Sequence, residues 1–177
     1  MSEDRDKQIL NSSISSYDNT ITLKEKQEES LLHIIKYANG CDVVISLPTG
    51  YGKSMVYTLL PHALRLKRNV EKGMVMVVCP LNIIQQDQIM TMTAKGVRAC
   101  RLSVTCSVTT AREEHGLMNW EATCSVEDVE QGLFDVVFCH PEALFCTKEG
   151  RELLESREFR KNIIAVVVDE CHTVELW

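Results

Sequence analysis

An eight-residue stretch, Leu-Pro-Thr-Gly-Tyr-Gly-Lys-Ser from Leu47 to Ser54, follows the apolar run Val43–Ile45 and precedes a segment with helical patterning. A strand, a glycine-containing loop and a helix in this order are the setting that a phosphate-binding loop requires. Glycines let the backbone curl until several N–H groups point at one phosphate, and a helix N-terminus attracts anions. The stretch therefore predicts a nucleoside triphosphate site in an α/β fold.

Within this loop, Lys53 would supply a cation for the outer phosphates, and the Ser54 hydroxyl would hold Mg²⁺. The first position of the general pattern G-x-x-x-x-G-K-[ST] is Leu47 here, so the pattern is not met in full. An ordinary helix-capping turn is the alternative explanation. The candidate nucleotide-binding residues of the loop are Thr49, Gly50, Gly52, Lys53 and Ser54.

A second motif lies near the C-terminus, where the apolar run 163–168 ends in Asp169 and Glu170. Ligands bind at the carboxyl ends of strands in open α/β sheets. At such a site Asp169 would hold Mg²⁺, and Glu170 would orient and deprotonate the attacking water. Acids that merely solvate a loop are the alternative interpretation. Together with Lys53 and Ser54, the two acids form one candidate catalytic site.

The composition fits a globular domain: 177 residues with 45% hydrophobic content can bury a sizeable core. The formal charge of −6 argues against a broadly basic surface, so binding to nucleic acid must be argued from motifs. Arg98, Arg101 and Arg112 are candidates for a groove that follows a nucleic-acid backbone, or else solvated surface. Trp120 is a candidate for base stacking, or else a core residue.

The eight cysteines contain no C-x-x-C pair, which argues against a zinc site. Cys139-His140 with Cys146 comes nearest to a ligand cluster, but a buried thiol beside a loop histidine is the simpler explanation and is preferred. Cys41, Cys79 and Cys139 lie in or beside apolar strand candidates, where a free thiol packs as a small hydrophobe. No signal peptide is recognisable. We therefore expect a reducing, intracellular compartment, nuclear or cytoplasmic, and not secretion.

The N-terminal residues 1–20 are polar with sparse apolar positions, and we expect a flexible or loosely docked arm before a single domain over 21–177. Apolar residues at helical spacing predict a helix over 24–37. A helix should also follow Lys53, with Pro61 kinking or ending its regular part.

Further along, strands and helices alternate. The predicted strands cover 74–79, 97–102, 134–139 and 163–168. The predicted helices cover 81–93, 110–120, a segment opening at Pro141, and 149–161, while 103–110 is predicted to be a loop. Crossovers of this length imply a mostly parallel sheet with helices on both faces.

Over residues 20–177 these motifs resemble the RecQ-like branch of the superfamily 2 DExH-box helicases, and specifically the first of their two RecA-like motor domains. Leu23–Gln27 looks like the adenine-recognition motif of that family, so the resemblance assigns base contact to Gln27 and Lys24. The loop 47–54 is similar to the family's P-loop, which does not require glycine at its first position.

The later motifs of the family have counterparts as well. Residues 77–81, with Gln86, Asp87 and Gln88, look like the motif that contacts the nucleic-acid backbone. Cys139–Leu144 resembles the motif that follows it, and Asp169–His172 resembles the acidic box.

The acidic box departs from the family at Cys171, where alanine is common. By resemblance, His172 couples the nucleotide site to the nucleic-acid site, the alternative being a capping or solvated loop histidine. Residues 173–177 are similar to the opening of the family's aromatic-rich loop, and the chain stops at Trp177. The later motif of the first domain and the second RecA-like domain, with its arginine fingers, are not in this sequence.

The resemblance implies ATP and Mg²⁺ as cofactors, DNA as partner, and a place in a 3′–5′ DNA helicase that also has a second RecA-like domain. Because arginine fingers and domain closure are missing, we expect this chain alone to hydrolyse ATP poorly and not to unwind DNA. Two alternatives remain open. One is a nucleotide-binding regulatory module without turnover, and the other is a P-loop protein of another class, such as a nucleotide kinase or a transport ATPase.

Overall fold

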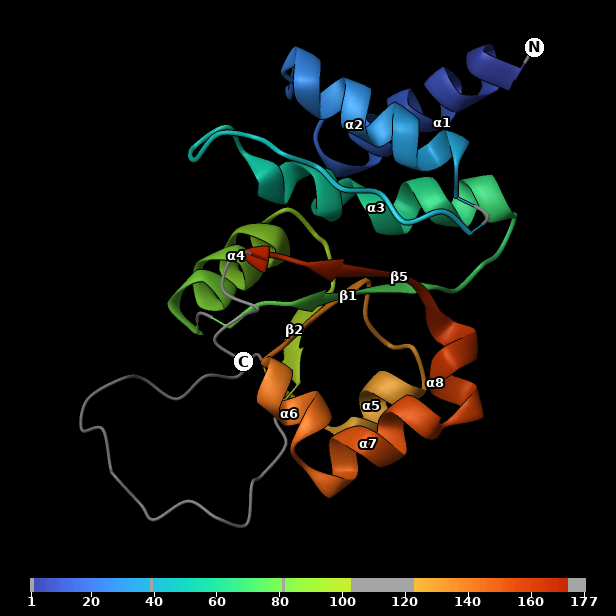
Figure 1. Cartoon of the computed structure of the whole chain (residues 1–177). Coiled ribbons are helices and arrows are strands. Elements are labelled where there is room, and N and C mark those ends of the chain that lie inside the picture. The colour runs from blue at the N-terminus through green and yellow to red at the C-terminus, as the bar shows by residue number, and fades with distance from the viewer. Residues whose placement is uncertain (1, 39, 81, 103–122, 172–177) are drawn as a thin grey trace.

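The centre of the fold is a sheet of five parallel strands in the order β3-β2-β4-β1-β5 (Figure 1). This computed structural model describes residues 2–38, 40–80, 82–102 and 123–171, and structural statements below refer to these residues. The strands are β1 (Met74–Val78), β2 (Ala99–Leu102), β3 (Thr123–Cys124), β4 (Val136–Cys139) and β5 (Ile163–Val168). Helices on both faces confirm the predicted RecA-like α/β class.

The middle strands β1 and β4 are buried along their whole length, as their continuous apolar runs predict for a sheet covered on both faces. Val77 pairs with Phe138 of β4 on one side and with Val167 of β5 on the other. Four of the five predicted strands are confirmed, as β1, β2, β4 and β5. Strand β3 was not predicted, because two residues are too short to show a period.

The apolar run Val43–Ile45 does not form the strand that was predicted before the phosphate-binding loop. Residues 41–48 have no strand pairing, and Figure 1 draws them as an extended trace outside the sheet. Val44 is 92% exposed, while Ile45 packs partly against the hydrophobic core. A run of β-branched residues favours extended backbone, but only a neighbouring strand with a free edge makes it part of a sheet.

Eight helices cover the sheet in the described residues. One face carries α1 (Ser2–Tyr17), α2 (Glu25–Lys36), α3 (Lys53–Arg68) and α4 (Asn82–Ala94), and the other carries α5 (Val126–Glu130), α6 (Pro141–Phe145), α7 (Lys148–Glu155) and α8 (Arg157–Asn162). The predicted helix 149–161 is divided in two because the Ser156 hydroxyl accepts the Phe159 N–H and caps α8. Helix α3 continues through Pro61 to Arg68, so this proline does not end it.

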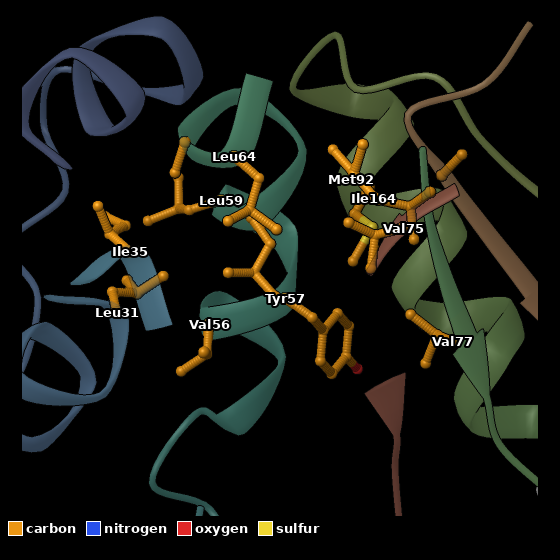
Figure 2. Packing of buried hydrophobic residues seen from close by; sticks show 14 of the residues in the cluster. Leu31, Ile35, Val56, Tyr57, Leu59, Leu64, Val75, Val77, Met92 and Ile164 are labelled. Carbon is orange, nitrogen blue, oxygen red and sulfur yellow. The ribbon is translucent and has the colours of Figure 1, made fainter. Parts of the chain in front are cut away.

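Helix α3 is the centre of the hydrophobic core on the face of the sheet that α1–α4 cover (Figure 2). One side of it packs Leu59 and Val56 toward Leu31 and Ile35 of α2, and the Tyr57 ring points the opposite way, toward the strands (Figure 2). All five side chains are less than a tenth exposed. The helix that follows the phosphate-binding loop is therefore held between α2 and the sheet.

The expectation of a flexible N-terminal arm is wrong, because residues 2–17 form helix α1, which packs on α3 and α2. Leu10 and Ile9 belong to the core, at 2% and 7% exposure. The buried Asp6 carboxylate accepts a 2.6 Å hydrogen bond from Lys67 of α3. Helix α1 has few apolar residues, and they are enough to bury one of its faces because that face packs on α3.

We expect Leu10→Ala to lower the free energy of unfolding by about 2–5 kcal/mol, because it removes a fully buried side chain and leaves a cavity. Urea denaturation at pH 7 measures the effect. The matched control is Ser12→Ala on the exposed face of the same helix, which should change stability by less than about 0.5 kcal/mol. Equal stability of the two variants would contradict a docked α1.

The described cysteines differ from the expectation in two respects. Cys100 of β2 and Cys124 of β3 form a disulfide with a Cα–Cα distance of 6.0 Å, because parallel pairing brings the two strands together. Cys41 is exposed rather than packed in a strand. Cys139 is a buried thiol as predicted, and burial raises its pKa to about 12. Several predictions fall outside the described residues: those for Arg112, Trp120, His172, 103–110, 110–120 and 173–177.

Candidate nucleotide and nucleic-acid site

The phosphate-binding loop has the backbone shape that anion binding needs. Gly50 and Gly52 adopt φ of +76° and +90°, in the left-handed region that glycine tolerates. Helix α3 begins directly after, at Lys53, and no side chain caps it. The first N–H groups of a helix have no partner within the helix, so an uncapped start offers them to an anion. This geometry fits a phosphate better than an ordinary capping turn.

The two polar side chains at the start of α3 are half-buried. In the described part of the chain the Lys53 ammonium has no ion-pair partner, so its charge remains available to a ligand. The Ser54 carbonyl accepts the Thr58 hydroxyl at 2.8 Å. Thr49 lies exposed in the turn before the helix. The loop residues named from the sequence therefore lie together at one helix end.

Gln27 of the adenine-type motif lies against the loop. Its amide nitrogen donates to the carbonyl oxygens of Tyr51 at 3.1 Å and Gly52 at 2.9 Å, and its oxygen accepts the Lys24 N–H at 2.9 Å. A Cβ added to Gly52 would lie 2.7 Å from that amide nitrogen. The Lys24 ammonium lies 4.8 Å from the centre of the Tyr51 ring. Gln27 thus supports the loop, and its oxygen retains a second lone pair for a ligand donor.

The acidic box follows β5. The Asp169 N–H donates to the Val78 carbonyl at 3.0 Å, which extends the ladder between β5 and β1 by one residue. One carboxylate oxygen, Oδ1, accepts the Glu170 N–H at 3.0 Å, and the other, Oδ2, accepts the Tyr57 hydroxyl at 3.4 Å. Glu170 has φ of +53°, a conformation that costs a non-glycine residue about 1–3 kcal/mol. Both acids lie at the carboxyl edge of the sheet, as predicted.

Tyr57 joins the two halves of the site, and sequence reasoning missed it. It lies on α3 one turn after Lys53, and its partner Asp169 is 112 residues away. In an α-helix, residues four apart lie on the same face, so the spacing Lys53 to Tyr57 was a usable signal.

The segments that resemble the nucleic-acid motifs also meet. Strands β1 and β4 are neighbours, so the loops that follow them lie side by side. The His140 ring nitrogen Nε2 lies 2.9 Å from the Pro80 carbonyl oxygen and must donate, since a carbonyl can only accept. Gln85 of α4 donates to the Cys79 carbonyl at 2.5 Å. These contacts tie the two loops together at the same sheet edge as Asp169.

Arg98 is exposed, as the solvated-surface alternative predicts, and it also makes an ion pair within the fold. Its guanidinium donates to both carboxylate oxygens of Asp135, at 2.9 and 3.1 Å, and Arg65 of α3 donates to the same carboxylate at 2.8 Å. Burial acts to raise the pKa of Asp135, but the bonds from Arg98 and the charge of Arg65 outweigh it and the net pKa is lowered. Arg98 therefore serves the fold.

Each helix that the structure describes is too short or too polar to span a membrane.

Comparison with known proteins agrees with this geometry. The DEAD/DEAH box helicase family model matches residues 24–177. The ATP-dependent helicase SGS1 of Saccharomyces cerevisiae is 28% identical over 138 residues, covering 78% of this chain and 9% of the relative. The ATP-dependent helicase wrn-1 of Caenorhabditis elegans is 28% identical over 155 residues, covering 87% and 12%. The ATP-dependent DNA helicase Q1 of Mus musculus is 26% identical over 136 residues, covering 77% and 18%.

The chain thus spans less than a fifth of the length of these relatives. Their RecQ-like character confirms the resemblance stated from the motifs. The match also removes the alternative of an unrelated P-loop class, because it includes the segments that such a class would lack. The chain belongs to the DEAD/DEAH box helicase family.

Proposed function

We propose that this chain is the first motor domain of an ATP-dependent DNA helicase that moves 3′–5′. It binds Mg·ATP between the phosphate-binding loop and the acidic box, and it binds nucleic-acid backbone at the loops after β1 and β4. The observation that carries the proposal is one connected set of contacts: Gln27 on the loop, the loop on α3, and Tyr57 of α3 on Asp169.

Each residue has a defined task in this proposal. The N–H groups around Gly50 and Gly52 and the Lys53 ammonium bind the phosphates. The Ser54 hydroxyl and the Asp169 carboxylate are the oxygen ligands that Mg²⁺ prefers, and the bound ion would neutralise charge on the phosphates. Glu170 takes the proton of the attacking water. His172, outside the described residues, keeps its predicted role in coupling the two sites.

Unwinding requires more than this chain in our proposal. The relatives are several times longer, and a second RecA-like domain is the partner that would close over ATP and supply arginine fingers. DNA is the proposed nucleic acid, and an intracellular location, nuclear or cytoplasmic, is part of the proposal. A regulatory module that binds nucleotide without turnover remains the alternative, and DNA-stimulated phosphate release from the longer protein distinguishes the two.

The test of the proposal is adenine selectivity. A fluorescent ATP analogue bound to the wild-type chain should be displaced by ATP at a concentration at least about tenfold below that of GTP, because one good hydrogen-bond difference is worth about 1.4 kcal/mol. Gln27→Ala should reduce this ratio toward one. It also loosens the loop and weakens both nucleotides, so the ratio is the informative quantity.

Glu28→Ala, an exposed neighbour on α2, is the matched control and should keep the wild-type ratio. Equal displacement by ATP and GTP in the wild-type chain would contradict an adenine site at Gln27.

A further inference from the structure

The Tyr57 ring is part of the core, but its hydroxyl is not needed for packing. The residue is 4% exposed, and its ring meets Phe138 of β4 edge-on, with centroids 6.1 Å apart and planes at 78°. A phenylalanine would fill the same space. Burying a hydroxyl is unfavourable unless it has a hydrogen-bond partner, so packing alone does not account for the oxygen at this position.

The partner of the hydroxyl is the Asp169 carboxylate, where Oδ2 accepts at 3.4 Å. Burial, with the negative charge of Asp169 second, raises the pKa of Tyr57 far above its ordinary value. An ionised carboxylate can only accept, so the Tyr57 hydroxyl is the donor in this contact. The O···O distance is long for a hydrogen bond between oxygens, which leaves room for it to shorten when the acid binds a ligand.

The carboxylate thus has a hydrogen-bond donor at each oxygen. The Glu170 N–H binds Oδ1 from the chain itself, and the Tyr57 hydroxyl binds Oδ2 from α3. A carboxylate oxygen has two lone pairs, so each oxygen retains one for a metal ion or a metal-bound water. Outer hydrogen bonds of this kind orient metal-binding carboxylates, and their loss typically costs 10- to 100-fold in metal affinity.

We propose that Tyr57 is a positioning residue that orients the Asp169 carboxylate toward Mg²⁺ from the same helix that begins at the phosphate site. The inference rests on the proposed function, since it needs Mg·ATP to bind there. Lys53 and Ser54 lie at the start of α3 and Tyr57 lies one turn later, so a single rigid helix sets the position of the phosphates and the direction of the acid.

Tyr57→Phe separates positioning from packing. The binding of a fluorescent ATP analogue is titrated with Mg²⁺ in the full chain, and affinity without Mg²⁺ is measured in EDTA. We expect the Mg²⁺ concentration at half-saturation to rise about tenfold, while the Mg²⁺-free affinity stays within about twofold because the phosphate contacts remain. Thermal melting checks the fold. Tyr17→Phe, which removes a hydroxyl from α1, is the matched control and should change neither value.

A Mg²⁺ half-saturation within about twofold of wild type in a folded Tyr57→Phe variant overturns the positioning role and leaves the proposed function intact. Equal weakening with and without Mg²⁺ also overturns it, because that pattern indicates a structural role. Absence of any Mg²⁺-dependent binding in the wild-type chain overturns the positioning role together with the proposed function.

A second measurement does not depend on the folding of that variant. The chain has four tyrosines, so ¹³Cζ-labelled tyrosine gives few NMR signals, and Phe substitution of the other three identifies Tyr57. Adding Mg²⁺ and a non-hydrolysable ATP analogue should shift the Tyr57 signal in the wild-type chain and not in Asp169→Asn. An unshifted signal in the wild-type chain while nucleotide binds would overturn the proposal.

Discussion

Lys53→Ala is expected to weaken binding of Mg·ATP by at least about 100-fold. A lysine that contacts two phosphates makes charge-assisted hydrogen bonds worth about 1.5–3 kcal/mol each, and 1.4 kcal/mol is a factor of ten in affinity. The described residues contain no acid paired with the Lys53 ammonium, so its removal leaves no buried charge behind. The measurement is titration with a fluorescent ATP analogue in the presence of Mg²⁺.

Two further variants make this result specific. Lys72→Ala removes an exposed lysine before β1 and should bind like wild type. Asp169→Ala should lose only the part of the affinity that depends on Mg²⁺, so its binding in EDTA should equal that of the wild-type chain. Wild-type affinity in Lys53→Ala would show that the nucleotide does not bind at this loop.

Asp135→Asn is expected to lower the free energy of unfolding by about 3–5 kcal/mol at pH 7. The carboxylate is buried and binds Arg65 of α3 and Arg98 before β2, and its own backbone carbonyl accepts the Val75 N–H of β1. Replacing the carboxylate by a neutral amide leaves the largely buried Arg65 without a counter-charge, while the exposed Arg98 keeps its contact with solvent. Urea denaturation measures the loss.

The matched control is Glu152→Gln, which breaks an exposed ion pair with Lys148 on α7. Exposed pairs of this type contribute about 0–1 kcal/mol, so the control should be close to wild type. If Asp135→Asn were no less stable than Glu152→Gln, the carboxylate would not be an important tie between the helix and the sheet.

Protonation of Asp135 should also lower the stability of the protein at acid pH. The pKa of Asp135 is lower in the folded chain than in the unfolded chain, where it is about 3.9. Its contribution to stability is therefore complete above that unfolded value and is lost as the pH falls through the lower, folded value. We expect the stability of the wild-type chain to fall below about pH 4, and that of Asp135→Asn to fall less over the same range. Parallel pH curves for the two proteins would contradict this assignment.

Local patterns in the sequence were sufficient for much of the fold and of the candidate site. The runs 74–78 and 163–168 are continuous and apolar, so their identity as strands does not depend on distant residues, although only the first is buried along its whole length. The phosphate-binding loop is likewise local, because glycines, a lysine and the start of a helix lie within eight residues. The adenine-type motif, the loop and the acidic box were all identified before any contact between them was known.

Other features depend on contacts between segments that are remote in the chain. Whether Val43–Ile45 joins the sheet depends on a free strand edge beside it, and whether α1 docks depends on the apolar face of α3. The Tyr57–Asp169 bond joins residues 112 positions apart. Period and propensity describe one segment at a time, so they identified the strands and the phosphate-binding loop here. The order in which strands pair, the docking of a helix and a bond between two motifs depend on the relative free energies of complete folded arrangements. A single segment does not contain this information, so only the tertiary structure shows the outcome.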